Sequence, residues 1–122
     1  MSVILVVDDN ANNLYLARFL LEKAGHQVAE AHNGVEAVQA VAQDTYDLIL
    51  MDIQMPILDG LSAARQIKEQ PDAPLIVALT AKAMMGDKDA ILASGCDGYI
   101  KKPLIPDTFV EQVQCCLTKK CL

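Results

Sequence analysis

The 122-residue chain lacks the features that mark membrane and secreted proteins. No apolar run approaches the roughly 18 residues that a membrane-spanning helix needs. The opening segment Met1–Asp9 is too short for the hydrophobic region of a signal peptide and lacks a basic start. We therefore expect a cytoplasmic protein without a membrane segment.

Cysteine motifs and positive charge are also scarce. Cys96, Cys115, Cys116 and Cys121 show no Cys-x-x-Cys spacing, and a helix would turn Cys115 and Cys116 to different faces, so we predict four reduced thiols. Ten Lys and Arg residues stand against 16 Asp and Glu residues, which gives a net charge of -6. This charge disfavours nonspecific binding to nucleic acid or anionic lipid, so we expect neither nucleic acid nor membrane among the partners.

Glycine-rich phosphate motifs are absent as well. The chain has no Gly-x-x-x-x-Gly-Lys-Ser/Thr loop of nucleotide hydrolases and no Gly-x-Gly-x-x-Gly turn of dinucleotide-binding domains. A flavodoxin would need a hydroxyl- and glycine-rich loop after its first strand, where this chain has Asp8 and Asp9. These carboxylates would repel a flavin phosphate, so nucleotide and flavin chemistry are disfavoured.

Apolar strand patterns alternate with helical patterns five times within one domain, residues 1–122. The most informative run is Leu48–Met51, which is apolar without a break, as in a strand buried on both faces of a parallel sheet. The expected strands are 3–7, 27–31, 46–52, 74–80 and 98–101, and the expected helices are 11–24, 35–43, 61–70, 84–94 and 106–117. This alternation predicts an α/β fold, a doubly wound five-stranded parallel sheet covered on both faces.

Two strand orders remain plausible, and the flavodoxin-like order 2-1-3-4-5 fits best. It places the most apolar strands in the middle and leaves the more polar strand 27–31 and the short strand 98–101 at the edges. Asp9 or Asn10 is the expected N-cap of the first helix, and Gly25 lies past its end. The side chains expected to face the core are Leu14, Ala17, Leu21 and Ala24; Val38 with Val41 or Ala42; Leu61, Ala64 and Ile67; and Phe109 and Val113 with Cys116 or Leu117.

Polar residues follow the strands at one end of the predicted sheet, namely Asp8, Asp9, Asp52, Thr80 and Lys102. In an open α/β sheet, ligands bind beyond the carboxyl ends of the strands. In the preferred order the first and third strands are neighbours, so three carboxylates converge, and at about 4 Å each pair repels by about 4 kcal/mol. Lys102 and a divalent cation can offset this repulsion, and hard oxygen ligands favour Mg²⁺ over zinc.

Asp52 alone admits a plainer interpretation, a strand-end residue that caps the following turn. A haloacid-dehalogenase-type phosphatase also uses a strand-end Asp with Mg²⁺. That chemistry requires a second Asp two residues later as general acid, and this chain has Gln54 there. A cap domain for the substrate is also missing.

Four motifs agree with a known family. They are Val-Asp-Asp-Asn at 7–10, the run from Leu48 to Gly60, Ala-Leu-Thr-Ala at 78–81 and Tyr-Ile-Lys-Lys-Pro at 99–103. With these motifs in order, the chain resembles a response-regulator receiver domain of two-component or phosphorelay signalling over nearly its whole length. Within the family it is similar to single-domain regulators and to the receivers of hybrid histidine kinases.

The resemblance implies that Asp52 is the phosphoacceptor. It would receive a phosphoryl group from a phosphohistidine of a histidine kinase or histidine phosphotransfer protein, or from a small phosphodonor. Asp9, Asp52 and the backbone carbonyl of Gln54 would bind Mg²⁺ directly, and Asp8 would act largely through water. Lys102 would pair with a phosphoryl oxygen.

The resemblance also implies a route for the signal. The Thr80 hydroxyl would move onto a second phosphoryl oxygen, and Tyr99 would swing inward as a rotameric switch. The peptide bond between Lys102 and Pro103 is expected to be cis. Signal would leave through helix 84–94, which begins with Met84 and Met85, strand 98–101 and helix 106–117, to a downstream protein partner.

The favoured function is therefore a phosphorylatable switch rather than an enzyme acting on an external substrate. It would catalyse only its own phosphotransfer and autodephosphorylation. The alternative is a scaffold that keeps the receiver fold and acts by protein binding without phosphotransfer. Because the chain ends just after the last predicted helix, we expect no DNA-binding or catalytic output domain.

Overall fold

The computed structural model describes residues 2–52, 60–70, 73–80, 98–101 and 106–118. Its strands are β1 (Val3–Val7), β2 (Gln27–Ala31), β3 (Leu48–Asp52), β4 (Leu75–Thr80) and β5 (Gly98–Lys101). Its helices are α1 (Ala11–Lys23), α2 (Gly34–Gln43), α3 (Gly60–Lys68) and α5 (Pro106–Thr118).

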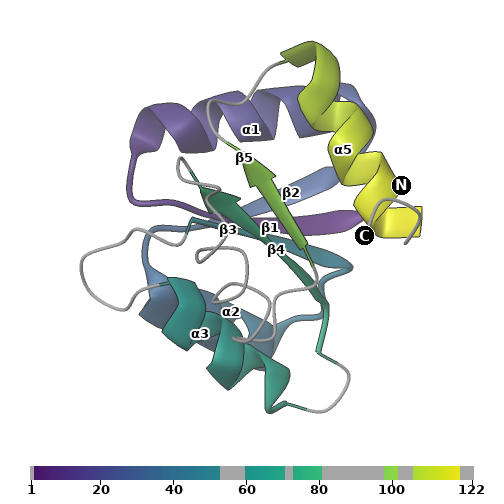
Figure 1. Ribbon diagram of the computed structural model, residues 1–122. Coiled ribbons are helices and arrows are strands. Elements are labelled where there is room, and N and C mark those ends of the chain that lie inside the picture. Colours follow the sequence, from purple (N-terminus) through teal and green to yellow (C-terminus); the bar gives the residue numbers. More distant parts are fainter. Residues whose placement is uncertain (1, 53–59, 71–72, 81–97, 102–105, 119–122) are drawn as a thin grey trace.

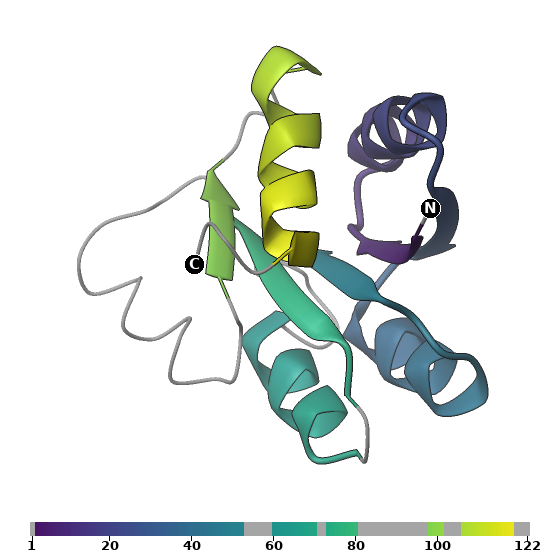
Figure 2. The ribbon, with the colours of Figure 1, turned by 90° about the vertical axis from the view of Figure 1, so that its right-hand side faces the viewer.

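All strand pairs in the sheet are parallel, and the strand order is β2-β1-β3-β4-β5. Helices α1 and α5 cover one face of the sheet, and α2 and α3 cover the other (Figures 1 and 2). The predicted α/β fold, its doubly wound parallel sheet and its strand order are therefore confirmed. The polar strand 27–31 lies at one edge, as expected.

Alternate residues of each central strand enter two apolar cores, one on each face of the sheet. This is why β1 and β3 carry unbroken apolar runs, since neither face of either strand meets water. The core on the α1 and α5 side contains Ile4, Val6, Leu14, Ala17, Leu21, Leu48, Leu50, Val77, Leu79, Ile100, Phe109 and Val113. The core on the α2 and α3 side contains Leu5, Val7, Ala31, Ala37, Ile49, Met51, Ala63, Ala64, Ile67, Ile76 and Ala78.

The start of the third strand differs from the prediction. The strand begins at Leu48 rather than at residue 46. Asp47 instead ties the chain to the start of β1, because its N–H donates to the Val3 carbonyl at 2.8 Å and its carboxylate accepts the Val3 N–H at 2.8 Å. Tyr46 packs half-buried against the core before the strand begins.

The end of the first helix also corrects one core assignment. Asn10 is the N-cap, and its side chain accepts the N–H groups of Asn12 at 2.8 Å and Asn13 at 3.3 Å. The helix ends at Lys23, and Gly25 turns the chain with a φ of 95°, which suits glycine. Ala24 is therefore the C-cap and is exposed, not buried with Leu21 as predicted.

The other helices agree with the prediction within two residues at their ends. Ala64, Ile67, Phe109 and Val113 are buried as expected, whereas Ala42 is exposed. Val38 and Val41 pack half-buried against the core. The predicted helix 84–94 lies outside the described residues, as do Cys96 and Cys121. The side chains of Leu61, Cys115, Cys116 and Leu117 are likewise outside the described part, so the thiol prediction stays untested.

Within the described ranges, no helix combines the length and apolar character that crossing a membrane requires. The cytoplasmic location stays a prediction.

His26 connects three parts of the fold at the end of the sheet where β1 begins. Its side chain is 9% exposed, and its Nδ1 accepts the Ser2 N–H at 3.2 Å. Its Nε2 lies 3.4 Å from Nε2 of Gln114 in α5. Burial lowers the pKa of His26 below its ordinary value of 6.5, because the imidazolium would lose its hydration there.

This lowered pKa predicts a pH-dependent stability. Between pH 6.5 and the lower folded-state pKa, unfolding takes up a proton at His26. The free energy of unfolding should therefore decrease as pH falls through that window, by at most about 1.4 kcal/mol per pH unit, and should be flat above it. His26→Asn keeps an acceptor for the Ser2 N–H but cannot titrate, so urea unfolding from pH 5 to 7 should show a smaller slope for this variant.

The matched control is His32→Asn, since His32 is exposed and its Nδ1 lies 3.0 Å from Glu36, whose pKa this contact lowers below its ordinary value of 4.5 and so below the tested window. This variant should keep the wild-type slope. If the slope disappears in His32→Asn and persists in His26→Asn, the pH dependence of the free energy of unfolding comes from His32, and the prediction is wrong.

Candidate functional site

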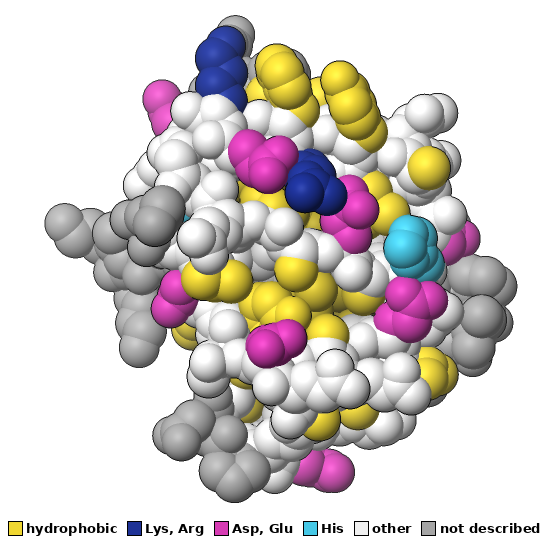
Figure 3. Space-filling model, turned by 180° about the vertical axis from the view of Figure 1, so that it is seen from behind, with side chains coloured by type: hydrophobic (Ala, Val, Ile, Leu, Met, Phe, Trp, Pro, Cys, Tyr) yellow, Lys and Arg dark blue, Asp and Glu magenta, His cyan; other side chains and the backbone are white. Residues whose placement is uncertain are grey.

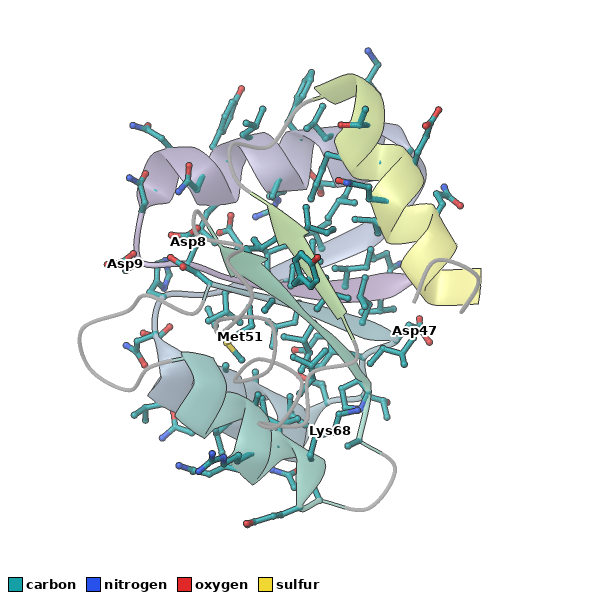
Figure 4. All side chains as sticks on the ribbon, in the orientation of Figure 1. Asp8, Asp9, Asp47, Met51 and Lys68 are labelled. Carbon is teal, nitrogen blue, oxygen red and sulfur yellow. The ribbon has the colours of Figure 1, made fainter. Side chains whose placement is uncertain are left out.

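The carboxyl ends of β1 and β3 bring three carboxylates together. Val7 pairs with Met51 in the parallel register, so Asp8 and Asp52 follow at adjacent strand ends. Asp8, Asp9 and Asp52 each offer one oxygen, and these oxygens all lie within 4.8 Å of one another. Figure 4 shows Asp8 and Asp9 at this end of the sheet and Asp47 at the opposite end.

The three carboxylates differ in their surroundings. Asp8 is 1% exposed and Asp52 is 4% exposed, whereas Asp9 is exposed to solvent. The Asn10 N–H donates to Asp8 Oδ1 at 2.9 Å, and the Asp8 N–H donates to the Ala31 carbonyl at 3.1 Å. Asp8 is therefore held in place by its neighbours in the turn and in β2, while Asp9 faces outward.

The site concentrates negative charge beside the start of a helix. Two unit charges 4.8 Å apart repel by about 3.5 kcal/mol at an effective dielectric constant of about 20. Helix α1 begins directly after this turn, and its first turn contains no acidic side chain. Its positive N-terminal end favours the carboxylates and offsets part of their repulsion.

The donor set fits a hard divalent cation. Carboxylate oxygens are the ligands that Mg²⁺ prefers, and Mg²⁺ is commonly bound through one or two carboxylates while it keeps several waters. Asp9 is open to the water such an ion retains, and Asp8 and Asp52 form the buried side of the site. The predicted convergence of Asp8, Asp9 and Asp52 is therefore seen in the structure.

Thr80 is the last residue of β4, on the strand that neighbours β3. Asp52 pairs with Leu79, and Thr80 pairs with Lys101, so the Thr80 backbone lies at the same end of the sheet as Asp52. The Thr80 side chain is outside the described part. Its proposed contact with a phosphoryl group stays a prediction.

Tyr99 lies in β5 opposite Ala78 and packs half-buried against the core on the α2 and α3 side. This position agrees with an aromatic near the edge of the sheet, and its role as a switch stays a prediction. Gln54, Lys102 and Pro103 lie outside the described residues, as do Met84 and Met85. The expected cis peptide bond therefore also falls outside the described residues.

Asn10 has a role at the site that sequence analysis missed. The sequence predicts an N-cap at this position, and the structure shows that Asn10 also donates its backbone N–H to Asp8 while its side chain caps α1. Asn10 thus joins the acidic cluster to the first turn of the helix. The Val-Asp-Asp-Asn motif indicates that Asn10 lies next to the acidic residues. The hydrogen bond from its N–H to Asp8 depends on the conformation of the turn, which the motif does not specify.

Sequence comparisons place the chain among signalling proteins. The model of the family described as "Response regulator receiver domain" matches residues 4–114. The polar-differentiation response regulator DivK of Brucella anthropi is 37% identical over 113 residues, which cover 91% of this chain and 92% of DivK. The sensor protein GacS of Pseudomonas syringae is 46% identical over 107 residues, or 83% of this chain, but the match spans only 12% of GacS.

Solved structures agree with the sequence comparisons. The receiver domain of a sensor histidine kinase from Pseudomonas aeruginosa, solved with a magnesium ion coordinated in its active site cleft, is 35% identical with a TM-score of 0.85. That match covers 97% of this chain and 95% of the other. The chemotaxis response regulator CheY4 of Vibrio cholerae is 28% identical with a TM-score of 0.89, over 93% of this chain and 97% of the other.

The crowding of carboxylates predicts that the metal-free protein is less stable than it could be. Asp9→Asn removes one charge from the cluster and keeps the shape of the side chain. In EDTA this variant should gain about 1 kcal/mol in the free energy of unfolding, less than the full pair repulsion because solvent screens Asp9. Asp47→Asn, at the opposite end of β3, is the control and should leave stability nearly unchanged, because the amide oxygen can still accept the Val3 N–H. If the free energy of unfolding rises equally in the two variants, repulsion within the acidic cluster does not destabilise the protein.

Proposed function

Because the chain belongs to the response regulator receiver domain family, we propose that it is a phosphorylatable switch in two-component or phosphorelay signalling. One observation carries the proposal, namely that Asp52 is a buried carboxylate within 4.8 Å of the carboxylate oxygens of Asp8 and Asp9. We further propose that the receiver domain comprises residues 1–122, because α5 continues to Thr118 beyond the matched range.

In the proposed reaction, Asp52 accepts the phosphoryl group. One oxygen of its carboxylate attacks the phosphorus of a phosphohistidine on a histidine kinase or histidine phosphotransfer protein. The new O–P bond forms as the P–N bond breaks, and the imidazole leaves with the bonding electrons and takes up a proton from solvent. Asp52 then carries an acyl phosphate, which water later hydrolyses in autodephosphorylation.

The neighbouring residues prepare the site for this transfer. Asp9, Asp52 and the backbone carbonyl of Gln54 would hold Mg²⁺ directly, and Asp8 would hold it largely through water. The bound ion would supply positive charge that offsets repulsion between the carboxylates and the incoming phosphoryl oxygens. Lys102 would donate to one phosphoryl oxygen as a point charge.

The response would reach a protein partner through residues 84–94, β5 and α5. The Thr80 hydroxyl would donate to a second phosphoryl oxygen, and Tyr99 would change rotamer in β5. The phosphorylated state would thereby shift the population between two surface conformations. Relatives support a histidine kinase as the phosphodonor, since the sensor histidine kinase GacS of Pseudomonas protegens contains a segment that is 44% identical to this chain over 106 residues. In this proposal the chain catalyses nothing beyond its own phosphotransfer and autodephosphorylation.

The first test changes the acceptor. Asp52→Asn removes the nucleophilic carboxylate but keeps its size, so acid-labile phosphate from acetyl phosphate and Mg²⁺ should fall to background. Asp47→Asn changes an exposed aspartate just before β3, at the opposite end of the sheet, and should be labelled like the wild-type protein. EDTA should abolish labelling of the wild-type protein.

Normal labelling of Asp52→Asn would place the phosphoryl group on another residue. If neither acetyl phosphate nor any of a set of purified histidine kinases labels the wild-type protein, the scaffold function becomes the better account.

The second test concerns transmission of the signal. Thr80→Ala removes the hydroxyl but leaves the acceptor, so this variant should still be phosphorylated. Its phosphorylation-dependent amide NMR shift at Tyr99 should be smaller than that of the wild-type protein without vanishing, since couplings of this kind are about 1–3 kcal/mol. A full wild-type shift at Tyr99 in phosphorylated Thr80→Ala would show that the signal takes a different route.

A further inference from the structure

The sheet ends at β2 in an open strand edge. In the part of the chain that the structure describes, β2 pairs with β1 only. The Gln27 N–H donates to the Ser2 carbonyl at 2.9 Å, and the Ala31 carbonyl accepts the Asp8 N–H at 3.1 Å. Because backbone groups alternate in direction along a strand, Val28 and Glu30 direct their N–H and C=O groups outward, away from β1.

A hollow lies on each side of this edge. The hollow on the α1 side has a volume of about 400 Å³, and its lining includes Tyr15, Phe19 and Glu30. The hollow on the α2 side has a volume of about 340 Å³, and its lining includes Ala29 and Tyr46. Figure 3 shows this side of the molecule, with apolar side chains above and below a row of charged ones.

The α1 side presents two aromatic rings to solvent. Tyr15 is 72% exposed and Phe19 is 52% exposed, and their ring centroids lie 6.4 Å apart with an interplanar angle of 15°. Covering such rings removes apolar area from water, which favours an occupant with an apolar side chain at this position.

The charges beside the rings indicate a basic occupant. Arg18 lies between two carboxylates, 3.3 Å from Glu22 Oε1 and 3.5 Å from Glu30 Oε1. The guanidinium of Arg18 thus pairs with two carboxylates, and the group of Arg18, Glu22 and Glu30 has a net charge of -1. A second copy of the chain would add the same acidic group and its own net charge of -6, so self-association at this edge is disfavoured.

We propose that the β2 edge is a docking site for an extended, basic segment of a partner protein. The segment adds a strand next to β2, bonds to the outward backbone groups of Val28 and Glu30, and places apolar side chains in the two hollows. The α1-side hollow lies level with Glu30, and the α2-side hollow lies level with Gln27 to Ala29. Side chains on opposite faces of a strand are separated by an odd number of positions, and Glu30 lies three positions from Gln27, so apolar residues three positions apart match the two hollows. This surface is separate from the phosphotransfer chemistry and does not depend on it.

The test uses a capped octapeptide of Thr and Lys with Leu at its third and sixth positions. Titration into the ¹⁵N-labelled, unphosphorylated protein should shift the amide peaks of Val28 and Glu30 and slow their hydrogen exchange, with a Kd of about 1 mM or below. A peptide of the same composition with Leu at positions three and five puts both Leu side chains on one face. That peptide should bind at least about fivefold more weakly, as should a version with Glu in place of Lys.

Protein variants locate the site. Phe19→Ser should raise the Kd about fivefold, whereas Val35→Ser should leave it unchanged. Val35 is the matched control because it is an exposed apolar residue, 42% exposed, on a helix and outside the lining of both hollows.

Three outcomes would overturn the proposal. One is the absence of peak shifts at Val28 and Glu30 with the peptide at about 5 mM, well above the expected Kd. Another is equal binding of the two Leu arrangements, which would show that the hollows do not set the spacing. The third is concentration-dependent shifts of the same amides without peptide, together with a dimer in sedimentation, which would make a second copy the occupant.

Discussion

The parallel pairing of β1 with β3 places Asp8 beside Asp52 and fixes the geometry of the candidate site. Both strands are buried on both faces, so neither can shift its register without moving apolar side chains out of a core. The two carboxylates therefore cannot relax apart as surface side chains would. Their closeness is imposed by the packing of residues that have no chemical role themselves.

This arrangement explains how an acidic cluster can exist in a folded protein. The cluster is destabilising taken alone, and the apolar cores above and below the sheet offset its cost. Asn10 contributes locally, because its N–H holds Asp8 while its side chain starts α1 with the positive helix end near the acids. Because the carboxylates repel one another, a cation that binds between them would stabilise the folded protein.

Helix α1 joins the acidic cluster to the open edge of the sheet. Its first turn follows directly on Asn10, and its outer face carries Tyr15 and Phe19 beside β2. Strand β1 makes a second connection, since it pairs with β3 at the acidic cluster and with β2 at the edge. A partner bound at β2 would therefore contact elements that also border Asp8 and Asp9, although the two surfaces use different residues.

The sequence by itself determined the sheet and most of the acidic cluster. Unbroken apolar runs identify β1 and β3 as buried strands, and the alternation of strands and helices requires parallel pairing. Asp8, Asp9 and Asp52 then meet because they lie at the carboxyl ends of two neighbouring strands of the sheet. These conclusions depend on local periodicity and on general rules for α/β folds, both of which can be read along a chain.

Only the tertiary structure decided the contacts between residues far apart in the sequence. It showed that His26 is buried beside Ser2 and Gln114, and that Arg18 lies between Glu22 and Glu30. It also showed that Ala24 is exposed because the helix ends at Lys23, although its spacing matches the buried face. Such details depend on where side chains of separate elements pack in three dimensions, and hydrophobic periodicity carries no information about those distances.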